Sequence, residues 1–145
     1  MPNYPPPIKA FIAWAVDTLA VHPEGVHRRI LREEPGDLLA APQLLPTHVV
    51  GRHGGFDREL GVDVIRVVVD TFATGPDPEQ ASDAAVERAE DIRYAVRVLL
   101  PGTDMAGIWI ARTRCTSAPA IRYWGKTGAV RRAQAIYELT THTPL

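Results

Sequence analysis

Residues 60–102 constrain the fold most, because they form the pattern of a long strand, a stop and an amphipathic helix. The strand part is rich in β-branched residues and has no helical periodicity. Gly75 and Pro76 end it, and residues 77–80 (Asp-Pro-Glu-Gln) supply an N-cap, a first-turn proline and a glutamine at the third position. Pro101 and Gly102 end the helix. The helix is predicted to bury one apolar stripe: Ala81, Ala85, Ala89, Ile92, Val96 and Leu99.

The length, composition, net charge and cysteine count of the chain limit the class of protein. A chain of 145 residues with 46% hydrophobic composition can bury the core of one domain. We expect a single domain over residues 1–145, with an extended proline-rich arm at 1–7. A formal net charge of -1 argues against an electrostatic nucleic-acid binder, which carries a basic excess. The only cysteine, Cys115, excludes an intrachain disulfide.

The first predicted helix, residues 8–20, has its apolar side chains on one face and contains Lys9 and Asp17. It is therefore interpreted as a surface helix, not as a signal peptide or a membrane span. We expect a soluble protein without an export signal.

Further elements follow from alternation and turn residues. The last two strands have no helix between them, so we expect antiparallel neighbours joined by a long connection. Connections of that length are uncommon and are usually functional or order against a partner. The predicted elements are strands at residues 26–31, 47–52, 107–116 and 129–141, a short helical segment at 35–41, a turn at 53–55 and the long connection at 117–128.

The long predicted strand that precedes Gly75 has two unlike faces. Residues 65, 67, 69, 71 and 73 suit packing beneath helices, whereas the other face mixes apolar and charged side chains. In a two-layer domain Val64, Val68 and Phe72 would be exposed together, and such an apolar patch usually marks an interface. We therefore expect another subunit to cover this face. The alternative is that Phe72 belongs to the core.

Basic residues gather on the last two strands and their connection. Arg112 and Arg114 share a strand face. One interpretation is a solvated strand edge that discourages aggregation. The other is an ionic contact with an acidic partner surface or with passing nucleic acid. The near-neutral net charge of the chain favours a contact with a subunit or another protein partner over nucleic acid. The predicted interface comprises Val64, Val68, Phe72, Arg122, Tyr123, Trp124, Lys126, Arg131 and Arg132.

His48, His53 and Asp57 form the one compact set of metal-ligand types. The two histidines would point to opposite faces of an extended strand, and no His-x-x-x-His or Cys-x-x-Cys pattern accompanies them. Cys115 is expected on the buried face of its strand, and the sequence has no nucleophile elbow or phosphate-binding glycine loop. We predict no catalytic, cofactor-binding or metal residue. A small metal-dependent hydrolase is the less favoured alternative.

Five segments occur in a characteristic order: the arm at residues 4–7, residues 49–55 with Asp57 and Arg58, residues 70–74, residues 83–85, and residues 130–132 with Ala135 and Tyr137. Together they resemble the tail terminator proteins of long-tailed (siphovirus-type) phages of actinobacteria. The likeness covers nearly the whole chain. Residues 121–126 (Ile-Arg-Tyr-Trp-Gly-Lys) depart from the family pattern, in which Pro-Tyr precedes acidic or Asn-Pro residues, so the role is carried over and the contacts are not.

The resemblance implies an α+β fold with a mixed, mostly antiparallel sheet of about five strands and two main helices packed on one face. It implies a structural virion protein without catalysis or cofactor. Such proteins form a ring, usually a hexamer, that caps the tail tube, ends tail elongation and joins the tail to the capsid neck.

The implied partners are further copies of the chain, the major tail tube protein and a neck or head-closure protein. Genomic DNA would pass through the ring without sequence-specific binding, and no membrane is involved. The implied location is the tail–neck junction of the virion, and the host cytoplasm during assembly. Another head-to-tail connector, a neck or head-closure protein, is the alternative within the structural class.

Overall fold

The computed structural model describes residues 7–20, 29–31, 46–59, 62–122 and 130–142, with backbone alone for residues 29–31 and 53–59. The sheet order is β1-β2-β3-β6-β5-β4. Strands β2 to β6 pair antiparallel and β1 pairs parallel with β2. The elements are α1 (Pro7–Ala20), β1 (Arg29–Leu31), β2 (Thr47–Glu59), β3 (Val62–Thr74), α2 (Pro78–Tyr94), the π-helical turn η2 (Ala95–Leu99), β4 (Thr103–Met105), β5 (Ile108–Arg122) and β6 (Val130–His142).

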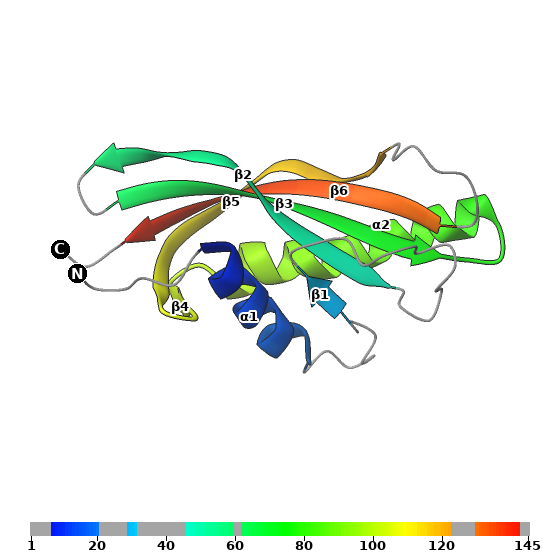
Figure 1. Ribbon diagram of the computed structural model, residues 1–145, viewed down its shortest axis with the longest axis horizontal. Coiled ribbons are helices and arrows are strands. Elements are labelled where there is room, and N and C mark those ends of the chain that lie inside the picture. The colour runs from blue at the N-terminus through cyan, green and yellow to red at the C-terminus, as the bar shows by residue number, and fades with distance from the viewer. Residues whose placement is uncertain (1–6, 21–28, 32–45, 60–61, 123–129, 143–145) are drawn as a thin grey trace.

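Both helices lie on the same side of a strongly curled sheet (Figure 1). The predicted α+β fold is therefore confirmed, with the short strand β4 as an addition. None of the helices in the described part of the chain is long and apolar enough to span a bilayer.

The predicted strand–helix unit is confirmed as β3 followed by α2. The Gln80 backbone N–H donates to the Asp77 carboxylate at 2.8 Å, and Pro78 occupies the first helical turn. The one error lies at the end of the stripe: Leu99 is 45% exposed and Leu100 is buried in its place. The π-helical turn η2 causes this, because its wider winding shifts the buried face.

The core lies between the sheet and the helices. Val67 and Val69 of β3 pack in one cluster with Tyr137 of β6, Phe11 of α1 and Ile92 of α2. In the part of α2 that precedes Ile92, alanines make the contact with the sheet. Their small side chains let the helix lie close to the strands. The alanine cluster is Ala73, Ala85, Ala89 and Ala133.

Strands β2 and β5 are longer than the sequence predicts. β2 continues through residues 53–55, where a turn was expected, because a register shift between Arg52 and Gly55 absorbs the irregularity. β5 continues to Arg122, so residues 117–122 are strand and not connection. The arm at 1–6, the helical segment at 35–41 and residues 123–129 lie outside the described residues.

The faces of β5 also change along the strand. Its register shifts between Ile110 and Arg112, so the simple alternation expected there fails. Ile108 and Ile110 are buried and Trp109 is 48% exposed, whereas Cys115 packs half-buried against the core.

Candidate subunit interface

The outer face of the sheet, defined here as the face that points away from α1 and α2, carries five of the six described residues of the predicted interface. Directly paired residues share a face, so the register gives the cross-strand rows of this surface. The β3–β6 pairing runs without a shift from Val62–His142 to Thr74–Val130. The rows are Glu59–Val62–His142–Trp109, Phe56–Val64–Thr140–Arg112, Arg66–Glu138–Arg114, Gly51–Val68–Ile136–Ser117, Val49–Asp70–Gln134–Ala120 and Thr47–Phe72–Arg132–Arg122.

Two of these rows are held by polar contacts. Arg66 Nε donates to Glu138 Oε1 at 3.1 Å. Gln134 Nε2 donates to Asp70 Oδ1 at 3.0 Å, and Arg132 Nε lies 3.8 Å from the same oxygen. Burial raises the pKa of Asp70, outweighing the hydrogen bond from Gln134 and the charge of Arg132, which lower it. The middle of the outer face is thus a partly desolvated polar network.

The expected exposed apolar patch is not present. Val64 and Phe72 are only 4% and 3% exposed, and Val68 is half-buried. Arg132 lies directly opposite Phe72 on β6, and its Nε lies 3.8 Å from Asp70 Oδ1. The expectation of joint exposure is therefore wrong, and Phe72 fits the alternative of a core residue.

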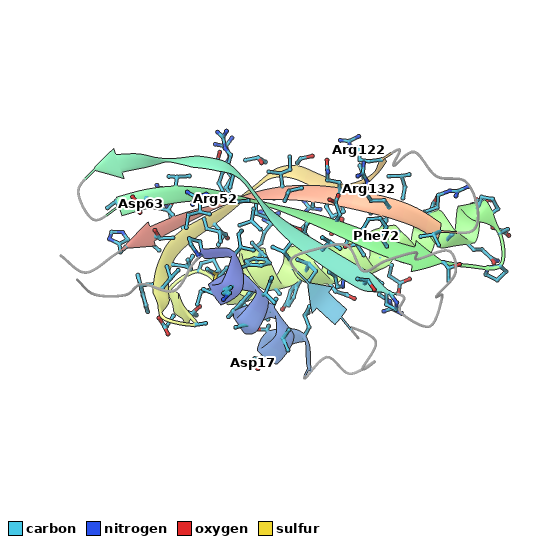
Figure 2. The ribbon with its side chains drawn as sticks, in the orientation of Figure 1. Asp17, Arg52, Asp63, Phe72, Arg122 and Arg132 are labelled. Atoms are coloured by element: carbon cyan, nitrogen blue, oxygen red, sulfur yellow. The ribbon has the colours of Figure 1, made fainter. Side chains whose placement is uncertain are left out.

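The structure brings some of the predicted residues together and separates others. Phe72, Arg132 and Arg122 share one row and lie on the same half of the sheet (Figure 2). Arg131 is on the opposite, helix-covered face, because neighbouring strand residues alternate, and its Nη1 donates to the Val130 carbonyl at 3.1 Å. Tyr123, Trp124 and Lys126 lie outside the described residues.

Three exposed arginines of β5 dominate the solvent side of the outer face. Arg112, Arg114 and Arg122 are exposed and have no ion-pair partner within the described ranges. The sequence identified them as a basic group, and the structure adds that all three belong to one face of one strand.

A second exposed surface was missed by the sequence analysis. Tyr94, Val98 and Leu99, at the junction of α2 and η2, are 60%, 57% and 45% exposed. The α-helical periodicity assigned Leu99 to the buried stripe, so it gave no signal for this patch. A shallow depression beside it is lined by Glu90, Arg93, Tyr94, Arg97 and Val98.

The residues considered for chemistry lie elsewhere. His48 is buried on the helix-covered face, and its Nδ1 lies 2.8 Å from Thr71 Oγ1. The side chains of His53 and Asp57 are outside the description. Within the described residues no three His, Cys, Asp or Glu side chains gather as metal ligands would. Tyr137 pairs with Cys115, and burial raises the pKa of its phenol strongly.

Comparison with known proteins shows a likeness of fold. A chain from the solved structure "Virion of native gene transfer agent (GTA) particle" matches with a TM-score of 0.52 and 17% sequence identity. The match covers 93% of this chain and 96% of that chain. No family model matches the sequence, and a search of curated proteins finds no match. At this identity the likeness shows that the two chains share a fold over nearly their full lengths.

Proposed function

We propose that the protein is a structural component of a virion. The observation that carries this proposal is the fold shared, over nearly the whole of both chains, with a chain of a gene transfer agent virion. The order of sequence segments that resembles phage tail terminators supports the same conclusion independently. A fold is compatible with many functions, so the agreement of the two observations matters more than either alone.

Within the virion we propose the role of tail terminator. Copies of the chain would form a hexameric ring that caps the tail tube, ends tail elongation and joins the tail to the neck. The ring would sit at the tail–neck junction, between the tube protein and a neck or head-closure protein, and DNA would pass through it. A ring needs two different contact surfaces on each subunit. The outer face of the sheet with the exposed arginines of β5, and the exposed side of α2, would supply these two surfaces.

Electron microscopy of particles assembled without this protein tests the proposal. We expect tails of uncontrolled length that do not join heads, and restoration of normal particles when the protein is supplied. Tails of normal length beside heads that have lost their DNA would instead identify a neck or head-closure protein. Intact, infectious or transducing particles would exclude a structural role in the virion.

A further inference from the structure

We infer that the arginines on the outer face of β5 bind the exposed acidic stripe of helix α2 in a second copy of the chain. This contact would join neighbouring subunits of the proposed ring. That such contacts close into a circle rests on the proposed function. The pairing itself depends only on two surfaces of the described chain, so it can be tested in solution without assembled particles.

The basic side of the contact is the outer face of the sheet, which no helix among the described residues covers. Its cross-strand rows hold five arginines against three carboxylates, Glu59, Asp70 and Glu138, although the chain as a whole has a net charge of -1. Glu138 pairs with Arg66 and Asp70 lies near Arg132, so the charges left over are those of β5. Arg112 and Arg114 are two residues apart, which places them about 7 Å apart along a strand.

The acidic side is a stripe on α2. Glu79, Asp83 and Glu87 are exposed and have no ion-pair partner among the residues that the structure describes. They are spaced by four residues, about 6 Å along a helix, and lie opposite the stripe of buried alanines. Like charges at this spacing destabilise a helix. The helix dipole accounts for Glu79 in the first turn but not for Glu87, more than two turns further on.

The geometry directs these two surfaces to different molecules. The helices lie on one side of the sheet (Figure 1). The arginines belong to the sheet face that points away from the helices, and the acidic stripe lies on the side of α2 opposite its buried alanines. They cannot meet within one chain. A contact between two different surfaces of identical subunits is heterologous, which is the type that generates rings.

A second copy fits the observations better than nucleic acid does. Phosphates would neutralise the arginines but would leave the like-charged helix stripe without a function. A second copy uses both surfaces at once, and the spacings of about 6 and 7 Å allow neighbouring charges to pair in register. The contact should weaken with salt, because the Debye length falls from about 10 Å at 0.1 M to about 3 Å at 1 M.

Charge reversal with mixing tests the inference. One variant carries Arg112→Glu and Arg114→Glu, and a second carries Asp83→Lys and Glu87→Lys. A matched control carries Lys9→Glu and Asp17→Lys, two exposed changes on α1. Circular dichroism checks that each variant folds, and sedimentation at low and high salt measures assembly.

We expect the wild-type chain and the control to assemble at low salt and dissociate at high salt. Each reversed variant alone should stay monomeric. Their equimolar mixture should assemble, because the acidic sheet face of one then meets the basic helix of the other. The variant with all four changes should assemble by itself.

Three results would overturn the inference: a wild-type chain that is monomeric at every salt concentration, folded variants that assemble alone, or a mixture that stays monomeric. Loss of duplex-DNA binding in the sheet variant, with unchanged assembly, would assign the arginines to nucleic acid. None of these results depends on particle morphology. The charge contact and the tail-terminator role can therefore fail separately.

Discussion

The two faces of strand β3 differ in what covers them. On the inner face Ile65, Val67 and Val69 are buried under helices. On the outer face Arg66 and Asp70 alternate with apolar residues and pair with β6 side chains. On the inner face the residues are selected for their volume, because their side chains and those of the helices must fill the space between the two layers. The outer face instead carries polar side chains that pair across the strands, Arg66 with Glu138 and Asp70 with Gln134.

Truncation of the core should give the largest effect and should separate helix-covered from exposed positions. Ile92→Ala is expected to destabilise the fold by about 2–4 kcal/mol, because Ile92 is buried between α2 and the sheet. Val98→Ala, at an exposed position of η2, should change the free energy of unfolding by less than about 0.5 kcal/mol. Urea denaturation measures both. Equal midpoints would show that the inner face does not carry the core.

A buried hydrogen bond on the inner face comes next. Thr71→Val removes the hydroxyl that meets His48 Nδ1 and should cost about 1–3 kcal/mol, since one buried polar atom loses this partner. Thr140→Val on the half-buried outer face is the control and should be nearly neutral. If both substitutions cost the same in thermal denaturation, the two faces do not differ in polar burial.

The outer face should show a pH dependence of defined sign. Because burial raises the pKa of Asp70 above 3.8, the folded chain binds this proton more tightly than the unfolded chain does. The contribution of Asp70 to stability therefore falls as the pH rises from below 3.8 through the folded pKa, and then stays constant. Asp70→Asn removes this loss, so the variant should gain stability relative to wild type between acidic and neutral pH.

Urea denaturation at a pH below 3.8 and at neutral pH measures this relative gain. Asp17→Asn, an exposed change on α1, is the control. A relative loss of stability by Asp70→Asn on going to neutral pH would mean that Arg132 and Gln134 outweigh burial at this carboxylate.

The smallest effect is expected for the ion pair of Arg66 and Glu138. The Arg66 side chain is 43% exposed, so a double-mutant cycle with Arg66→Gln and Glu138→Gln should give a coupling of about 1 kcal/mol or less. The coupling should shrink further at high salt. A coupling of several kcal/mol, insensitive to salt, would place this pair in the interior and remove the contrast between the faces.

The unit of β3 and α2 could be predicted from the sequence because its signals are local. The Asp77 cap, Pro78 and the alanine stripe each act within a few residues. The full lengths of β2 and β5 could not be predicted in this way. Gly54 and Gly55 are turn residues by local preference, yet pairing with β3 carries the strand on through a register shift. Strand length in a sheet is decided by partners distant in sequence.

In the candidate interface, too, some features follow from the local sequence and others depend on strands distant in sequence. Alternation correctly placed Val64, Val68 and Phe72 on one face of β3. It could not show that Arg132, from a strand 60 residues later, lies beside Phe72. It placed Arg112 and Arg114 on one face but could not add Arg122, because two register shifts lie between Arg114 and Arg122 and the predicted strand ends at residue 116. Which face a residue occupies is local information, whereas how deeply it is covered depends on the assembled sheet.

The unshifted pairing of β3 with β6 has a mechanical consequence. Thirteen consecutive residue pairs, from Val62–His142 to Thr74–Val130, form a ladder about 40 Å long, whereas the β2 and β5 ladders on either side contain bulges. Bulges are the points at which a strand bends, so we expect the continuous β3–β6 ladder to be the stiffest part of the sheet. The bulged strands on either side should adapt their shape to a neighbour more readily than this central pair does.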